Sequence, residues 1–417
     1  MKSIRLLLTI FLLASVSACS SNKKPKPPVA DKIPFEVFDK RIDNYYWMRL
    51  SDEQKAASEP DEQTKKVLAY LNSENEYTNA VMKHTEPLQK KIFDEIVGRI
   101  KKEDESVPYL DNGYYYYTRY LEGSEYPVYL RRKESPGAKE EILLDVNKLA
   151  EGQEFCSVAQ VSVSRDNKLL AFGMDTVGRR RYTIWFVDLE TGSFLPDKID
   201  NTTGQAEWAA DNKTVFYVGK DFETLRADRV LRHKLGENPE GDETVFFEDD
   251  ETFSVDLQLT KSKKYIVIQS RQTLSTEARL IDVNQPYGSI IVFEPRSKNH
   301  EYHIDHLGRE FFIRTNADGA SNFKLMKTEE GRTGKEYWKD VIPHRSDVLL
   351  ENFELFHDYL VASERIKGLP NLRIISLKGA GEHYLDFGEE TYTASINVNP
   401  NAGTEILRYS YTSLTTP

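Results

Sequence analysis

The fold is decided by a recurring segment of the kind Leu169-Leu-Ala-Phe-Gly-Met-Asp175, in which apolar and aromatic residues run together. Similar segments begin at residues 114, 215, 265, 311, 359 and 406, at intervals of about 49 residues. Short runs of aromatic and β-branched residues favour strands over helices. This recurrence predicts a chain that is mainly β and is built from repeated units.

Each recurring segment is expected to be one strand of a hairpin. Turn signals such as Asp211-Asn212-Lys213 precede most of them, and a partner strand such as Tyr182–Asp188 follows. Hairpins that recur at intervals of about 45 to 55 residues match the four strands of a propeller blade. A β-sandwich would not keep so even a period. We therefore predict a seven-bladed β-propeller over residues 106–417.

The seventh blade is expected to be incomplete. At a repeat of about 49 residues, the last blade would need about 20 residues beyond Pro417. Only its two inner strands are therefore predicted, around residues 394–398 and 406–411. This arrangement would leave Tyr409 and Tyr411 on an unpaired edge, which proteins normally avoid.

Residues 33–105 are expected to form a short α-helical extension ahead of the propeller. Apolar residues recur at helical spacing in two stretches, which are Val67, Leu68, Leu71 and Val81, and then Leu88, Ile92, Phe93, Ile96, Val97 and Ile100. We predict that two helices pair through these apolar stripes, and that the stripes also need a further partner surface.

The first residues have the features of an export signal. Lys2 and Arg5 precede a short apolar stretch, and Val16-Ser17-Ala18-Cys19 resembles a bacterial lipobox. We predict a signal peptide over 1–18, lipidation of Cys19 and a flexible Pro-rich tether over 19–32. The protein would then be an exported, membrane-anchored lipoprotein of the bacterial cell envelope, on its periplasmic side or at the surface. An ordinary secretory peptide with an incidental cysteine is the alternative.

Charge and cysteine content narrow the possible partners. The chain has 56 Lys and Arg against 67 Asp and Glu and a net charge of -11, so no nucleic-acid partner is expected. If Cys19 carries lipid, the other cysteine, Cys156, has no partner for an intrachain disulfide. Cys156 is expected to be a small buried residue at the start of a strand.

No catalytic or metal-binding residue is predicted within this chain, and no cofactor. The one Gly-x-Ser sequence, Gly319-Ala320-Ser321, lacks the second glycine of a hydrolase nucleophile elbow and lies in a predicted hairpin turn. His300, His303 and His306 are close in sequence, but no Cys or helical His-x-x-x-His supports a metal site. We expect these histidines to lie on strands, exposed to solvent.

Four stretches resemble one known family. They are Arg41–Arg49, Asp175–Thr183, Val341–Arg345 and Leu407–Pro417, and they resemble oligopeptidase B, in the prolyl oligopeptidase family of serine peptidases. The resemblance extends over about residues 33–417. It implies a helical extension, a seven-bladed propeller and a C-terminal α/β-hydrolase domain that cleaves short peptides after Lys or Arg.

The same resemblance implies that the catalytic Ser, Asp and His belong to a hydrolase domain that is absent here and would begin beyond residue 417. The helical extension would pack on that domain. The propeller would act as a lid that admits short peptides and excludes folded proteins. We therefore expect this chain to be inactive alone. An exported lipoprotein propeller that binds peptides, other proteins or a separately encoded hydrolase subunit is the alternative.

Two charged segments have alternative interpretations. Arg179, Arg180 and Arg181 are expected in a hairpin loop that is either simply solvated or ion-paired, or that, together with Asp175, faces the hydrolase domain and helps to hold it closed. The acidic run Glu248–Glu251 is expected to be solvated, although an acidic lining could attract Lys- or Arg-containing peptides.

Overall fold

The computed structural model describes residues 24–379 and 381–416. Cys19 and the signal peptide lie outside the described residues, so the lipidation site stays a prediction. The chain divides into two compact units, Met1–Lys101 and Lys102–Pro417. This division falls within a few residues of the predicted end of the helical extension, and each unit is described by itself.

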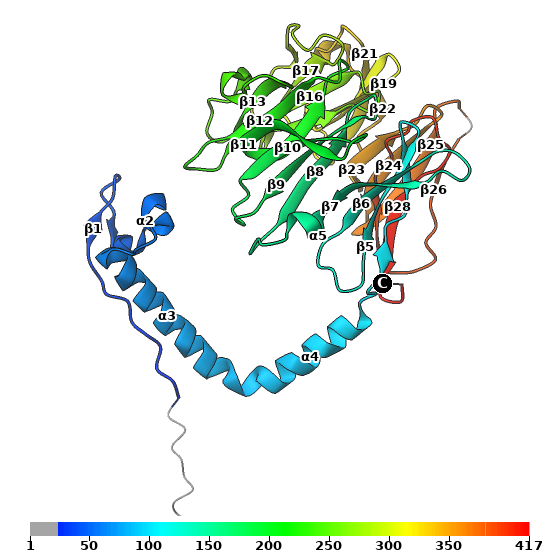
Figure 1. Ribbon diagram of the computed structural model, residues 1–417. Helices are drawn as coiled ribbons and strands as arrows, with labels where there is room; N and C mark the ends of the chain where they lie inside the picture. Colours follow the sequence, from blue (N-terminus) through cyan, green and yellow to red (C-terminus); the bar gives the residue numbers. More distant parts are fainter. Residues whose placement is uncertain (1–23, 380, 417) are drawn as a thin grey trace, which may run out of the picture. The chain divides into compact units, whose positions relative to one another are not determined.

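The second unit consists of small antiparallel sheets, which we call blades 1 to 7 in chain order (Figure 1). Blade 1 is followed by the short helix α5 (Val146–Leu149). The strands of blade 1 are β3 (Asp104–Glu105), β4 (Tyr109–Asp111), β5 (Tyr114–Tyr120), β6 (Val128–Lys133) and β7 (Glu140–Asp145).

Blades 2 and 3 form one continuous sheet because a single long strand, β11 (Ser193–Trp208), serves both. Its first part pairs with the third strand of blade 2, and its last part pairs with the second strand of blade 3. The remaining strands are β8 (Ser157–Val163), β9 (Leu169–Asp175) and β10 (Tyr182–Asp188) in blade 2, and β12 (Thr214–Lys220), β13 (Ala227–Lys234) and β14 (Glu243–Phe247) in blade 3, where the 3-10 turn η3 (Pro239–Gly241) precedes β14.

Blades 4, 5 and 6 are separate four-stranded sheets. Blade 4 comprises β15 (Ser254–Leu259), β16 (Tyr265–Gln272), β17 (Ser275–Asp282) and β18 (Ile291–Glu294). Blade 5 comprises β19 (Tyr302–Leu307), β20 (Glu310–Thr315), β21 (Lys324–Glu329) and β22 (Lys339–Ile342), with the 3-10 turns η4 (Ala317–Gly319) and η5 (Lys335–Tyr337). Blade 6 comprises β23 (Val348–Leu355), β24 (Tyr359–Ile366), β25 (Leu369–Ser376) and β26 (Glu382–Tyr384).

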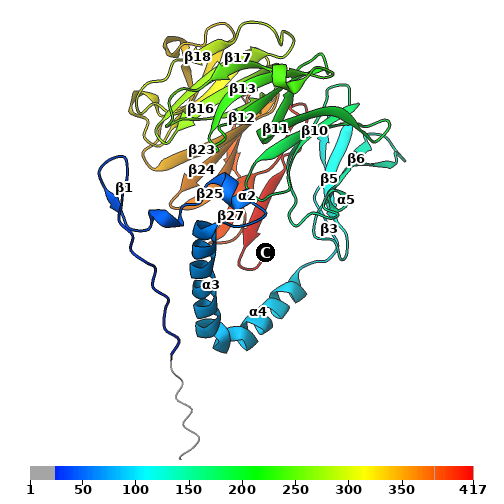
Figure 2. The same cartoon turned by 60° about the vertical axis from the view of Figure 1, so that its left-hand side comes forward.

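Blade 7 has two strands among the described residues, β27 (Tyr392–Ile396) and β28 (Tyr409–Ser413), as predicted from the repeat length. β27 lies beside β25 of blade 6 (Figure 2). On the other side, the Arg408 guanidinium donates a hydrogen bond to the Val107 carbonyl and lies 5.5 Å from the Tyr109 ring centroid. Blade 7 therefore contacts blade 1 through side chains.

The apolar cores lie between neighbouring blades, because side chains along a strand alternate between the two faces of its sheet. In β16 of blade 4, Ile266 and Ile268 pack in the core shared with blade 3. Val267, between them, packs in the core shared with blade 5. Such strands must be apolar at nearly every position. This is why the recurring segments are continuous apolar runs.

The strand order distinguishes the two ends of the propeller. The chain enters at β3, where Asp104 pairs with Tyr120 at the end of β5. We call this end, where the second strand of each blade finishes, the entry face. At the opposite end, the turns that join first and second strands contact one another, since Asn112 bonds the Arg165 carbonyl and Asp166 bonds Asn212.

The first unit contains two long helices, α3 (Glu62–Met82) and α4 (Glu86–Arg99), joined by the turn η2 (Lys83–Thr85). Asp61 caps α3 by accepting the Thr64 backbone N–H at 2.7 Å. No helix in the described part of the chain is long and apolar enough to cross a membrane. The unit also includes β1 (Phe35–Glu36), β2 (Ile42–Asp43), η1 (Tyr46–Met48) and α2 (Asp52–Ala56).

The predicted pairing of the two helices through their apolar stripes is wrong. Val67 is buried, but its neighbours along the stripe are exposed. The exposed large apolar side chains are Leu68, Leu71, Val81, Met82, Leu88, Ile92, Phe93, Ile96, Val97 and Ile100. Within the first unit, these stripes therefore lack the partner surface that the sequence calls for.

Candidate functional site

A cavity of about 650 Å³ lies where the inner strands of the first four blades meet. Residues from these blades line it together, among them Tyr109 and Asp111 of blade 1, Gln160 and Arg165 of blade 2, Glu207 and Trp208 of blade 3, and Leu259 and Lys263 of blade 4. Four different sheets contribute to one space, so the cavity lies at the centre of the ring and extends between blades 1 and 2.

Glu207 is the acidic group of this cavity. Its residue is 9% exposed, and Gln160 Nε2 donates a hydrogen bond to Glu207 Oε1 at 2.8 Å. Burial raises the pKa of the Glu207 carboxyl to about 7, although the hydrogen bond from Gln160 opposes this effect. The carboxyl therefore changes its charge close to neutral pH.

The basic groups of the cavity are already engaged. Lys263 Nζ pairs with the Asp111 carboxylate, and the Arg165 guanidinium donates to the Lys263 carbonyl. Burial lowers the pKa of Arg165. These contacts also connect blades 1, 2 and 4 at the end of the ring opposite the entry face.

A polar network centred on Lys261 joins blades 4 to 7. Its Nζ lies 2.5 Å from Glu354 Oε1 and also donates to the Asn399 carbonyl, while its backbone N–H bonds Asp305 at 2.7 Å. Burial raises the pKa of Asp305 to about 6. One lysine therefore connects four consecutive blades.

Asp175 is the last residue of β9, and its carboxylate holds the loop that follows on the entry face. It is 2% exposed and accepts backbone N–H groups from Val177 at 2.8 Å, Gly178 at 3.1 Å and Arg180 at 2.7 Å. Gly178 has a φ of 78° and Arg180 a φ of 56°, so this turn uses left-handed backbone. Asp175 thus fixes the conformation of this loop through three backbone hydrogen bonds.

The three arginines of this loop differ in their exposure to solvent. Arg179 and Arg180 are exposed, and Arg181 is half-buried and donates to the Phe222 carbonyl at 2.8 Å. Lys220 Nζ lies 2.7 Å from the Arg180 carbonyl. Burial, together with Arg180 and Arg181, lowers the pKa of Lys220. The loop is therefore a basic patch that spans blades 2 and 3 on the entry face.

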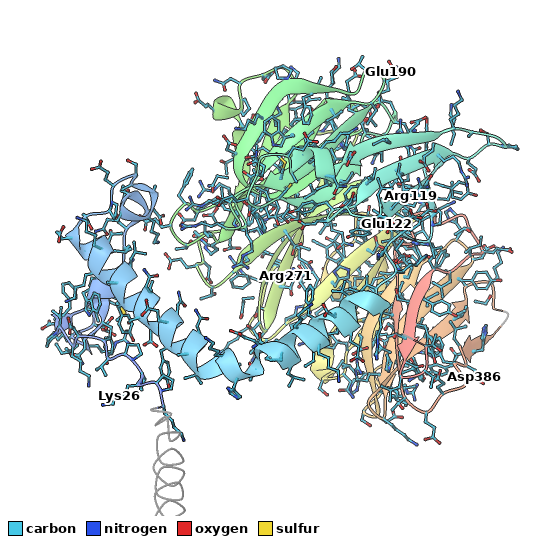
Figure 3. The ribbon with its side chains drawn as sticks, turned by 60° about the horizontal axis from the view of Figure 1, so that its bottom comes forward. Lys26, Arg119, Glu122, Glu190, Arg271 and Asp386 are labelled. Carbon is cyan, nitrogen blue, oxygen red and sulfur yellow. The ribbon has the colours of Figure 1, made fainter. Side chains whose placement is uncertain are left out.

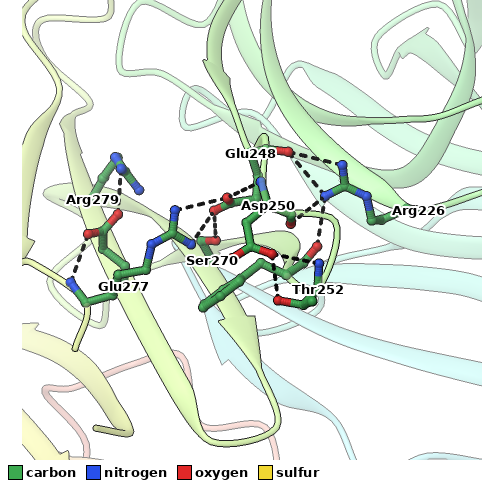
Figure 4. A network of polar contacts seen from close by, with 9 residues as sticks. Arg226, Glu248, Asp250, Thr252, Ser270, Glu277 and Arg279 are labelled. Atoms are coloured by element: carbon green, nitrogen blue, oxygen red, sulfur yellow. Dashed lines mark hydrogen bonds and ion pairs between the residues drawn. The ribbon is translucent and has the colours of Figure 1, made fainter. Parts of the chain in front are cut away.

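The expectation of a solvated acidic run at Glu248–Glu251 is wrong at its first residue. Glu248 is buried, and its carboxylate accepts from the Arg296 guanidinium at 3.1 Å and from the Ser270 hydroxyl (Figure 4). Arg226 donates to the Glu248, Asp250 and Phe253 carbonyls at 3.0 to 3.2 Å. Burial raises the pKa of the Glu248 carboxyl, but the hydrogen bonds from Ser270 and Arg296 outweigh burial, so the pKa lies below its ordinary value. The network fixes the link between blades 3 and 4.

The expectation of solvent-exposed histidines is wrong as well. His300 and His306 are buried, and each has its own partner, because His300 Nε2 bonds Thr315 at 3.0 Å and His306 Nδ1 bonds Ser262 at 2.7 Å. Burial lowers the pKa of His303 to about 4. Among the described residues, no group of three or more potential ligands could hold a metal ion.

The last two residues considered in the sequence are Ser321 and Cys156. Ser321 is exposed and follows the turn η4, as the sequence predicts. Cys156 is buried immediately before β8, which confirms that prediction, and burial raises the pKa of its thiol.

The family is decided by a match to the model of the prolyl oligopeptidase N-terminal β-propeller domain, over residues 27–417. The chain belongs to this family. The chain is 42% identical to dipeptidyl aminopeptidase BI of Pseudoxanthomonas mexicana and 29% identical to protease 2 of Moraxella lacunata, with 100% and 94% of this chain covered. It spans 59% and 56% of those proteins.

A solved structure gives the same assignment. Oligopeptidase B from Leishmania major superposes on this prolyl oligopeptidase propeller with a TM-score of 0.85 and 29% identity, over 94% of this chain and 58% of that one. The resemblance found in the sequence motifs is confirmed. The predicted fold, a propeller preceded by a short helical extension, is confirmed too.

Sequence reasoning missed the cavity and its carboxyl. Glu207 lies between Ala206 and Trp208, both in the apolar core, and the sequence analysis identified no role for it. Its burial depends on Gln160, which is 47 residues away and in another blade. No local signal could have revealed this contact.

Proposed function

We propose that this chain is the substrate-gating propeller of an oligopeptidase B-like serine peptidase that cleaves short peptides after Lys or Arg. The propeller restricts access to the active site by size, and a partner α/β-hydrolase domain supplies the Ser, Asp and His. The chain is inactive without that domain. Membership of the family and the similarity to oligopeptidase B support the proposal.

The observation that carries the proposal is the exposed apolar surface of α3 and α4. In α4, Phe93 is 65% exposed and Leu88 is 57% exposed, and the apolar stripe of this helix has no partner in its own unit. Each large apolar side chain loses about 1.5 to 3 kcal/mol by remaining in water. A row of exposed large apolar side chains along two helices is typical of an interaction site. A hydrolase domain is the partner that the family provides.

The basic loop Arg179–Arg181 is proposed to contact the same hydrolase domain. It lies at the end of the blades where the chain enters the propeller. Its guanidinium groups suit carboxylates of a facing domain. Cys19 is proposed to anchor the protein in the cell envelope.

Activity measurements test the central proposal. The purified chain is incubated with an arginine p-nitroanilide and, separately, with a serine-directed fluorophosphonate. We expect neither hydrolysis nor labelling. Hydrolysis together with labelling would show that the chain carries its own nucleophile and would overturn the proposal.

The partner is tested by adding the hydrolase portion of an oligopeptidase B, produced separately. We expect peptide hydrolysis to arise only in the mixture, with Phe93→Ser weakening the association. Lys90→Ser, an exposed change on the same helix, is the matched control. A chain that melts cooperatively, stays monomeric and never supports hydrolysis would instead favour a peptide-binding or protein-binding lipoprotein.

The anchor is tested in cells by palmitate labelling. We expect incorporation into the full chain, loss of label in Cys19→Ala and full label in Cys156→Ala. Label that persists in Cys19→Ala would exclude lipidation at that residue.

A further inference from the structure

The central cavity contains one buried carboxyl that is not paired with a cation. Glu207 Oε1 accepts from the neutral amide of Gln160, and Oε2 has no hydrogen-bond partner among the described residues. The two nearby basic groups have other partners, since Lys263 is bound to Asp111 and Arg165 to the Lys263 carbonyl. A buried carboxylate without a counter-charge is costly, so proteins normally pair it or leave it neutral.

Aromatic residues form part of the wall of the cavity that contains this carboxyl. Tyr109, Tyr116, Tyr117 and Tyr129 of blade 1 and Trp208 of blade 3 line the same cavity. The faces of aromatic rings attract ammonium and guanidinium groups, most strongly where water is excluded. They also supply apolar surface for an alkyl chain. The cavity therefore combines one carboxyl that has no cation partner with aromatic surface that favours an organic cation.

We propose that this cavity is a binding site for an organic cation, an ammonium or guanidinium group on a short alkyl stem, with Glu207 as its counter-ion. The stem packs against the tyrosines and the charged head binds Glu207 Oε2. Both a Lys or Arg side chain of a peptide and a free small amine have this chemistry. The site belongs to the propeller alone, so it stands whether or not a hydrolase domain acts with this chain.

Glu207 also gives the site a pH dependence. Its carboxyl, which has a pKa of about 7, is mostly ionised at pH 8 and mostly neutral at pH 6. An alkyl ammonium stays charged at both values, because its pKa is above 10. Affinity for the cation should therefore fall about tenfold from pH 8 to pH 6.

Titration calorimetry with the full chain tests the proposal. The probes are Nα-acetyl-lysine methylamide, butylammonium, and Nα-acetyl-norleucine methylamide, which has the same stem without the charge. We expect at least one of the two cations to bind at pH 8 and to bind about tenfold more weakly at pH 6. Equal affinities for the two cations would indicate recognition of free amines, and a preference for the lysine probe would indicate a peptide.

Two variants isolate the carboxyl. Glu207→Gln keeps an oxygen that can accept from Gln160 but removes the charge, so the affinity at pH 8 should fall at least tenfold and lose its pH dependence. Glu190→Gln, in the exposed turn after β10, is the matched control (Figure 3). The proposal would be overturned by any of three results. These are a norleucine probe that binds as tightly as the cations, no binding of either cation at pH 8, and a Glu207→Gln variant whose affinity for the cation is unchanged. The comparison of cation affinity at pH 8 and pH 6 uses the unchanged chain, so it tests the proposal even if a variant does not fold.

Discussion

The propeller and the helical extension use apolar residues in opposite ways. In blades 3 and 4, a strand such as β16 buries Ile266, Val267 and Ile268 in two different cores. In the extension, α4 has an equally regular stripe, yet Ile92 and Phe93 are exposed. A blade finds its partner in the next repeat, whereas a lone amphipathic helix depends on another domain. Periodicity in a sequence predicts a face to be covered, but not what covers it.

The largest expected effect lies inside the propeller. Phe216 is 1% exposed in the core between blades 3 and 4, so Phe216→Ala should lower the free energy of unfolding by about 3 to 5 kcal/mol through lost burial and a cavity. Ile92→Ala in α4 should change it by less than about 0.5 kcal/mol. Denaturant unfolding followed by near-UV circular dichroism measures both. Equal effects would remove the contrast between the units.

A backbone change should have the next largest effect. Gly204 lies where β11 passes from blade 2 to blade 3, with φ at 84°, and an added Cβ would come within 2.7 Å of the Ala159 Cβ. Gly204→Ala should therefore cost about 3 kcal/mol, from left-handed strain together with overpacking. Gly192→Ala has a similar φ of 71° but open space around it, so it isolates the strain alone, at about 1 kcal/mol. Similar melting temperatures for the two variants would contradict the predicted clash.

A buried histidine should make propeller stability depend on pH. His233 is fully buried, 2.8 Å from Asp242 and 3.1 Å from Asp197. Burial lowers the pKa of His233, but the two aspartates outweigh burial and raise it above its ordinary value. The stabilisation is therefore complete below the unfolded pKa of about 6.5 and is lost as pH rises through the folded pKa.

The test compares His233→Gln with the unchanged chain. The variant should be less stable by about 2 kcal/mol at pH 5.5, and the difference should shrink towards pH 9. His84→Gln, at an exposed position in the extension, is the control substitution. A difference that grows with pH would mean that His233 is held neutral.

The smallest effect on stability is expected in the extension. Phe93→Ser should leave the free energy of unfolding within about 0.5 kcal/mol of the unchanged chain, because the side chain is already exposed. It should nevertheless reduce binding of a hydrophobic dye and self-association in light scattering. A large loss of stability would mean that Phe93 is covered in solution.

Much of the fold could be predicted because its signal is local and repeated. The recurring segment at Leu169–Asp175 coincides with β9, and the segment at 114–120 coincides with β5. The site could not be predicted in the same way. Glu207, Glu248 and the buried histidines owe their burial to residues of other blades, and such contacts leave no pattern in a short stretch of sequence.

The shared strand β11 has a mechanical consequence. Blades 2 and 3 share the backbone of β11, whose pairing with β12 is interrupted between Thr202 and Ala206, so we expect the two blades to move together as one plate. Blades 7 and 1 meet through side chains such as Arg408. If the ring breathes, the strain will fall on the junctions where separate sheets meet through side chains, of which this is one, and will spare the plate. The cavity that contains Glu207 is bordered by that plate and by blade 1, so its width will follow the movement of one wall against a fixed one.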